Sequence, residues 1–236
     1  MPLVCIASSF PEEQNRNLGI VDNLALGFSD IIGHDCVRRV SFETMADHVT
    51  QLRPNLVILV GSPLPHTSDY RAIARAAAHC GALFTFWTVE DPYEFDYNYR
   101  FVDYADVIFS NDKWAVEFYN HNNVVYLPTA AALDYKRPVE SFSQRDLDVF
   151  FCGVAFGVRQ RVISDALPVL QRYRSLVFGE GWPVIDEQII RNVRISQSKL
   201  IDYYTSSKFV LNIGRDYYLA NNFRATFVCH ARTSYL

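Results

Sequence analysis

The carboxylates Glu90, Asp91 and Asp96 lie in one short segment of the first half, directly after an apolar run typical of a strand. In open α/β sheets ligands bind beyond the carboxyl ends of strands, where a carboxylate can deprotonate or bind a hydroxyl group. We therefore predict that Asp91 and Glu90 act in catalysis. The alternative is that Asp91 and Pro92 only begin a turn and that Asp96 caps the next helix.

Asn111 and Asp112 follow the next apolar run, Val107 to Phe109, and precede a segment predicted to be helical over 112–120. Both residue types are favoured helix caps, so a capping role is the simpler interpretation. A ligand contact is compatible with that role.

A small-residue loop, Gly153 to Gly157, follows a strand-like run in the second half and is followed by Arg159 and Arg161. Glycine permits close approach of a ligand to the backbone, a helix N-terminus presents N–H groups, and arginine adds positive charge. The loop is neither a dinucleotide fingerprint nor a Walker motif. Its chemistry nevertheless fits phosphate binding.

Trp182 lies in a second glycine-rich loop, Gly179-Glu180-Gly181-Trp182. An aromatic side chain there can stack on a nucleobase or pack over the end of the sheet, and the residues favour neither. Arg215 and Asp216 end a further strand-like run. They can pair with each other or face a ligand.

These residues need a scaffold of alternating strands and helices. Apolar runs rich in β-branched and aromatic residues predict six strands in the first half, at Leu3–Ala7, Val37–Phe42, Leu56–Val60, Leu83–Thr88, Val107–Phe109 and Val124–Leu127. Helical periodicity predicts a helix from Leu18 to Ile32, ending at Gly33, and an Ala-rich helix over 69–80 ends at Gly81. The pattern indicates an α/β, Rossmann-like domain over residues 1–135.

The apolar pattern is lost over the predicted linker, 136–146, and restarts in a second Rossmann-like domain, 147–236. We expect three strands there, at Leu147–Cys152, Leu176–Phe178 and Phe209–Ile213. Val158 to Tyr173 is predicted to be helical with a break at Pro168. Ser196 or Ser198 is expected to cap a helix that ends near Ser206.

Charge and composition exclude several classes of protein. A net charge of −4, with few basic clusters, argues against a nucleic-acid partner. The five cysteines form no C-x-x-C pair, and neither they nor the six histidines have metal-ligand spacing, so we predict thiols and no metal site. The N-terminus lacks the pattern of a signal peptide, and no apolar run is long enough to span a membrane. We therefore expect a cytoplasmic location.

Six ordered motifs resemble the CgeB-type spore maturation proteins and related glycosyltransferases. In the first half these are W-x-x-x-D-P-Y-x-F-D at Trp87–Asp96, F-x-N-D at Phe109–Asp112 and Y-L-P-x-A-A at Tyr126–Ala131. In the second half they are D-V-x-F-x-G at Asp148–Gly153, F-G-x-G-W at Phe178–Trp182 and L-N-I-x-R-D at Leu211–Asp216. The matches cover roughly residues 80–236.

The resemblance implies a GT-B fold, in which two Rossmann-like domains face each other across a cleft. It implies transfer of a sugar from a nucleoside-diphosphate sugar to an acceptor, without a cofactor or a metal, because helix N-termini and basic side chains neutralise the leaving diphosphate. It places the donor on the second domain and the acceptor on the first. The implied donor-binding residues are Gly153, Arg159, Arg161, Trp182, Arg215 and Arg232, and the acceptor-side residues are Tyr93, Asp96, Asn111 and Asp112.

In the family, the segment that Arg232-Thr233 resembles continues into a helix with a glutamate that holds the donor ribose. This sequence ends at Leu236, so we expect an incomplete second domain. That expectation leaves a second interpretation open, a catalytically inactive relative that acts as a binding module. An uncovered second domain would also expose apolar surface, which favours a homodimer.

Overall fold

The computed structural model describes residues 2–14, 18–63, 70–131, 138, 141–183 and 185–214. The chain forms two compact units that divide between Ala130 and Ala131. Residues 132–137, just after this division, lie outside the described ranges. The predicted linker, 136–146, includes a short 3-10 helix, η6 (Phe142–Gln144), which belongs to the second unit.

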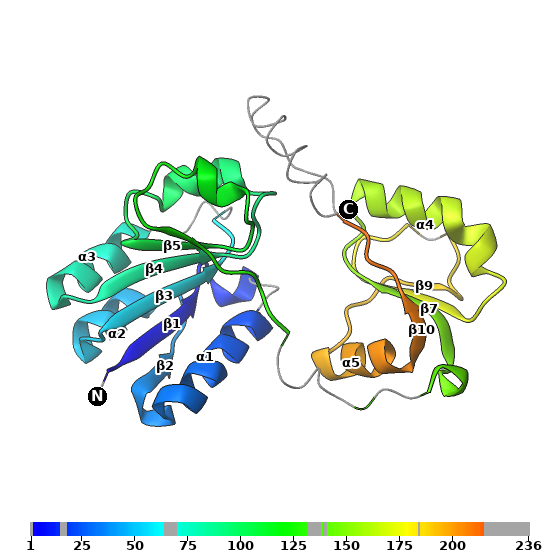
Figure 1. Cartoon of the computed structure of the whole chain (residues 1–236), viewed down its shortest axis with the longest axis horizontal. Coiled ribbons are helices and arrows are strands. Elements are labelled where there is room, and N and C mark those ends of the chain that lie inside the picture. The colour runs from blue at the N-terminus through cyan, green and yellow to red at the C-terminus, as the bar shows by residue number, and fades with distance from the viewer. Residues whose placement is uncertain are drawn as a thin grey trace. The chain divides into compact units, whose positions relative to one another are not determined.

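The first unit is built on a six-stranded parallel sheet with the order β2-β1-β3-β4-β5-β6 (Figure 1). Its strands are β1 (Val4–Ser8), β2 (Val37–Arg39), β3 (Leu56–Gly61), β4 (Leu83–Thr88), β5 (Val107–Ser110) and β6 (Val124–Tyr126). All six predicted strands are confirmed, although β2 ends three residues before the predicted Phe42. Continuous apolar runs mark these strands because a parallel sheet is covered on both faces.

Among the described residues, three α-helices connect the strands of the first unit: α1 (Leu18–Ile32), α2 (Met45–Leu52) and α3 (Tyr70–Cys80). Short 3-10 helices also occur, at η1 (Glu12–Gln14), η2 (His34–Cys36), η3 (Phe95–Arg100) and η4 (Ala115–Phe118). The predicted end of α1 at Gly33 is confirmed, and Gly33 has a φ of +93°. The predicted helix over 112–120 is wrong. Only η4 forms there, because Tyr119 turns to an extended backbone with φ −69° and ψ 129°.

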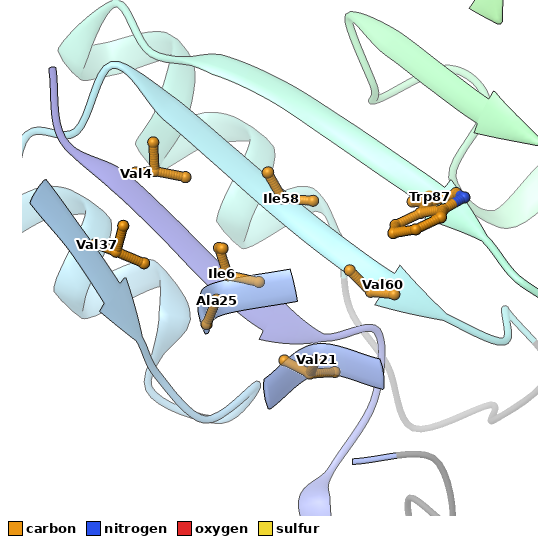
Figure 2. Packing of buried hydrophobic residues seen from close by; sticks show 8 residues of the cluster. All are labelled: Val4, Ile6, Val21, Ala25, Val37, Ile58, Val60 and Trp87. Carbon is orange, nitrogen blue, oxygen red and sulfur yellow. The ribbon is translucent and has the colours of Figure 1, made fainter. Parts of the chain in front are cut away.

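Alternating residues of the strands form a core with α1 (Figure 2). Val4 and Ile6 of β1 point to the same face as Ile58 of β3, and Val21 and Ala25 of α1 pack over them. The intervening residues of β1, Cys5 and Ala7, are fully buried on the other face. Right-handed connections in this strand order place α2 and α3 on the face opposite α1.

The second unit contains a four-stranded parallel sheet with the order β10-β7-β8-β9. Its elements are β7 (Leu147–Cys152), α4 (Gly157–Leu170), β8 (Ser175–Phe178), β9 (Ile190–Arg191), α5 (Gln197–Ser206) and β10 (Ser207–Val210). The predicted β7 is confirmed. So is the cap of α5, where Ser196 Oγ accepts the backbone N–H of Lys199 at 3.4 Å.

Three predictions for the second unit are wrong. The sheet has four described strands rather than three, because the two-residue β9 pairs with β8. α4 does not break at Pro168, which lies in its last turn, where one missing N–H removes only the bond to the carbonyl of Ser164. β10 begins at Ser207, two residues before the predicted start, because it follows α5 without a connecting loop.

Two further properties follow from the described residues. None of the helices within the described ranges is both long and apolar enough to cross a membrane. Cys5, Cys36, Cys80 and Cys152 are free thiols, and Cys229 lies outside the described residues.

Candidate functional site

Each sheet has one point at which the strand order reverses. In the first unit β1 lies between β2 and β3, and in the second unit β7 lies between β8 and β10. At this point the connections from two adjacent strands leave in opposite directions, so a crevice forms outside their carboxyl ends, and ligands of open α/β sheets bind there. The ends of β1 and β3 and the ends of β7 and β10 are therefore the places at which to look for a site.

Asp91, the first predicted catalytic residue, is buried just after β4 and is 4% exposed. One carboxylate oxygen, Oδ2, accepts three hydroxyl groups, from Thr88, Ser110 and Tyr119, each at 2.7 Å. Thr88 and Ser110 are the last residues of the adjacent strands β4 and β5 and are paired in the sheet. The carboxylate therefore ties two strand ends to Tyr119, beyond η4.

Burial raises the pKa of the Asp91 carboxyl, while the hydroxyl groups of Ser110, Tyr119 and Thr88 oppose the shift and the negative charge of Asp112 adds to it. Burial and the neighbouring Asp91 likewise raise the pKa of the Tyr119 hydroxyl. A carboxylate with this environment is poorly placed to meet a substrate. The geometry supports a positioning role for Asp91.

The predicted residues Asn111 and Asp112 join the same network. Asn111 clamps the backbone of Asp91, since its Oδ1 accepts the Asp91 N–H at 3.1 Å and its Nδ2 donates to the Asp91 carbonyl at 3.2 Å. Asp112 is buried and its Oδ1 accepts the backbone N–H groups of Trp114 and Ala115 at 2.9 and 2.8 Å. This confirms capping at the start of η4 by Asp112.

Glu90, Tyr93 and Asp96, the other predicted residues of this loop, are half-buried. Of the two carboxylates predicted to act in catalysis, Glu90 is the one with exposed surface. The predicted residues of the first unit thus fall into a buried group that shapes the loop and a group that retains contact with solvent.

The strand-order reversal of the first unit is held together by hydroxyl groups. Ser9, after β1, donates its hydroxyl to the carbonyl of Ser62, after β3, at 2.7 Å. Ser62 in turn donates its hydroxyl to the buried carboxylate of Glu94. Gly61 has a φ of +136°, and a Cβ there would lie 2.6 Å from Ser9 Oγ. A guanidinium also contacts this loop, since Arg100 donates to the carbonyl of Pro63, next to Ser62.

Arg39 ends β2, the strand that pairs with β1. Its guanidinium pairs with Glu12, and its Nε lies 2.7 Å from the carboxylate of Asp22. Two carboxylates thus neutralise this cation, which argues against a phosphate site at the ends of β1 and β2.

Arg159 holds the strand-order reversal of the second unit. It lies in the first turn of α4, and its Nε donates to the carbonyl of Ile213, beyond β10, at 2.9 Å. Its Nη1 donates to the carbonyl of Val154, beyond β7, at 3.0 Å. The guanidinium carbon also lies 5.6 and 5.3 Å from the ring centroids of Phe151 and Phe156. One cation therefore bridges both sides of the crevice.

Two glycines make this arrangement sterically possible. A Cβ on Gly153 would lie 2.9 Å from Nη1 of Arg159. Gly179 has a φ of +148°, and a Cβ on it would lie 1.9 Å from the carbonyl oxygen of Gly153. The loops after β7 and β8 therefore approach each other through their backbones.

Trp182 packs beneath these loops and is 3% exposed. Its Nε1 donates to the Gly153 carbonyl at 3.0 Å, and its ring meets Phe151 edge to face with centroids 5.9 Å apart. Of the two predicted alternatives, the structure has the packed one. Stacking on a nucleobase is not supported by this geometry.

Two further basic groups of the second unit, Arg194 and Arg161, differ in their relation to the loop after β7. Burial raises the pKa of the Cys152 thiol, at the end of β7, and the positive charges of Arg159 and Arg194 oppose that shift. Arg194 thus lies close enough to act on the end of β7, although it was not predicted as a site residue. Arg161 is exposed on α4. Arg215 and Arg232, both predicted donor-binding residues, lie outside the described residues.

Sequence reasoning found Asp91 and Arg159 but missed the groups that hold them. Thr88 and Ser110 were detectable as polar residues that end consecutive strands, whereas no spacing in the sequence points to Tyr119. No protein-family model matches the chain, and no curated protein matches it. The functional argument therefore depends on the geometry of the two units.

Proposed function

We propose that this protein is a glycosyltransferase of GT-B architecture, in which the second unit binds a nucleoside-diphosphate sugar and the first unit receives the acceptor. The observation that carries the proposal is the position of Arg159 between the loops after β7 and β10. A cation at the strand-order reversal of an open sheet, beside a helix N-terminus, provides the chemistry that a diphosphate requires.

The proposed binding of the donor diphosphate depends on the N-terminus of α4. Its N-cap residue, Phe156, has no side chain that can cap the helix, so no side chain of that residue competes with an anion for the first N–H groups. The partial positive charge of the helix N-terminus adds to Arg159 and Arg194. Together they would stabilise the negative charge that develops on the leaving diphosphate.

The proposed activation of the acceptor depends on the loop after β4. Asp91 and Asn111 hold the backbone of this loop, and Glu90, half-buried beside Asp91, is our choice for the general base that deprotonates an acceptor hydroxyl. Asp91 is assigned the positioning of that loop. The proposed division of labour differs from the sequence-based prediction, which gave both carboxylates a catalytic role.

Calorimetry with UDP and with GDP tests the proposal. We expect binding of at least one of them, and we expect Arg194→Ala to weaken it about tenfold, because a charge-assisted hydrogen bond contributes about 1.5 kcal/mol or more. Arg172→Ala is the matched control, since Arg172 is exposed in the turn beyond α4 and should leave binding unchanged.

Absence of binding by either nucleotide to the folded chain would contradict the proposal. Nucleotide binding without hydrolysis or transfer of the sugar from UDP-glucose or GDP-mannose would favour the binding-module interpretation instead.

A further inference from the structure

A groove of about 640 Å³ opens in the first unit at the amino ends of β3 and β4, the sheet edge opposite Asp91. α3 forms one wall, and the segment that precedes β5 forms the other. Because the groove lies at the other edge of the sheet from the loops after β4 and β5, the proposed transfer reaction does not use it.

The α3 wall is basic. Arg71 and Arg75 line the groove four residues apart on one face of the helix, and both are exposed. The helix sequence YRAIARAAAHC contains no acidic residue. Like charges four residues apart destabilise a helix slightly, and α3 offers no acidic partner to Arg75.

The opposite wall is acidic. Asp103 and Asp106 are exposed and line the groove, and the carboxylate of Asp106 also accepts the backbone N–H of Phe84 at 2.8 Å. Within the described ranges neither Arg75 nor Asp103 forms an ion pair or a side-chain hydrogen bond. Arg75 and Asp103 therefore present opposite charges on facing walls of the groove and form no ion pair with each other.

The floor between the walls is small and apolar. Ala74 and Ala78 of α3 contribute no long side chain, and Leu83 at the start of β4 is 46% exposed. Small residues on a helix allow a second helix to approach closely, and an exposed leucine gains from being covered.

We propose that this groove is the interface of a two-fold symmetric homodimer. In such a dimer the same surface meets itself, so α3 of each copy faces the Asp103 wall of the other copy. The basic wall of each copy then lies against the acidic wall of its partner, and this contact occurs twice. A free anion would meet Asp103 and Asp106 together with the arginines, and a cation would meet the arginines. A second copy of the chain complements both walls.

Sedimentation equilibrium of the full chain over a wide concentration range tests the dimer. We expect a monomer–dimer equilibrium that weakens as salt is added, since the contacts are solvent-exposed charges. Arg75→Glu and Asp103→Arg should each weaken dimerisation at least tenfold, because like charges then face each other across the interface. The double variant should recover most of the wild-type affinity, since the reversed pair attracts again.

Arg172→Glu is the control for a general effect of charge, because this exposed residue lies in the second unit. Circular dichroism should show that every variant is folded. The proposal is overturned by a wild-type chain that stays monomeric, by a dimer that neither reversal weakens, or by a double variant no better than the single ones.

Discussion

Both crevices of this chain lie at a strand-order reversal, but different groups hold them. At the reversal in the first unit, Ser9 and Ser62 connect the loops through hydroxyl groups that end on Glu94. At the reversal in the second unit, the guanidinium of Arg159 connects the loops after β7 and β10, and the loops after β7 and β8 approach closely at Gly153 and Gly179.

This difference shows how one architecture can serve two kinds of ligand. Hydroxyl and carboxylate groups suit a neutral ligand rich in hydroxyl groups, whereas a cation beside a helix N-terminus suits an anion. The fold alone would not distinguish them, since both units place their loops at the carboxyl ends of parallel strands. The side chains at the reversal carry the functional argument.

Glycine substitutions at the two crevices should give the largest difference. Gly179→Ala should destabilise the second unit by about 4 kcal/mol or more, because the new Cβ would overlap a backbone carbonyl that cannot move away. Gly61→Ala has a similar positive φ, but its Cβ would meet the hydroxyl of Ser9, which can rotate. We therefore expect a smaller loss, about 1–3 kcal/mol, in the first unit.

Denaturant unfolding followed by hydrogen exchange in peptides of each unit measures both effects. Gly33→Ala is the control for conformational strain alone, since Gly33 has a φ of +93° and nothing within 4 Å of the added Cβ. A Gly61→Ala variant that lost as much stability as Gly179→Ala would show that backbone overlap is not what distinguishes the two crevices.

Removal of the Asp91 carboxylate should have the next largest effect. Asp91→Ala leaves the buried hydroxyl groups of Thr88, Ser110 and Tyr119 without their shared acceptor, so we expect a loss of about 3 kcal/mol, confined to the first unit. Asp30→Ala, an exposed change on α1, should cost less than about 0.5 kcal/mol. Chemical denaturation with both variants provides the measurement.

The pH dependence of the wild type relative to Asp91→Asn sharpens this prediction. The folded state raises the pKa of Asp91, so the folded state binds the proton more tightly than the unfolded chain does. The contribution of Asp91 to stability is therefore present at low pH and is lost as the pH rises from about 4 through the folded-state pKa. The opposite slope would mean that the hydroxyl groups, not burial, dominate the environment of Asp91.

The sheets were largely predictable because buried parallel strands leave continuous apolar runs. Short or polar elements were not. β9 has only two residues, and its pairing of Val177 with Ile190 depends on the tertiary fold. At 112–120 the capping signal of Asp112 was correct, yet the helix does not continue, since Tyr119 has an extended backbone and its hydroxyl donates to Asp91.

The site residues show the same limit. The position of Asp91 after a strand was visible in the sequence, but its burial follows from the register that aligns Thr88 with Ser110 and from a tyrosine 28 residues away. The sequence was equally compatible with stacking of the Trp182 indole on a nucleobase and with its packing under the loop. The hydrogen bond from Nε1 to the Gly153 carbonyl decides for packing. Long-range partners decide whether a polar or aromatic group faces a ligand.

Trp182→Phe should have the smallest effect on stability of these substitutions. It distinguishes a Trp182 that supports the loop from one that stacks on a nucleobase. Phenylalanine retains most of the packing against Phe151 but loses the hydrogen bond from Nε1 to the Gly153 carbonyl, so we expect a loss of about 1–2 kcal/mol in the second unit. Trp114→Phe is the control, because Trp114 lies in the first unit and is 38% exposed.

If Trp182 instead stacked on a nucleobase, the substitution would weaken UDP or GDP binding while leaving the free energy of unfolding unchanged. Calorimetry and denaturation on the same samples distinguish the outcomes, and a change in binding alone would contradict the assignment of Trp182 as a support beneath the loop.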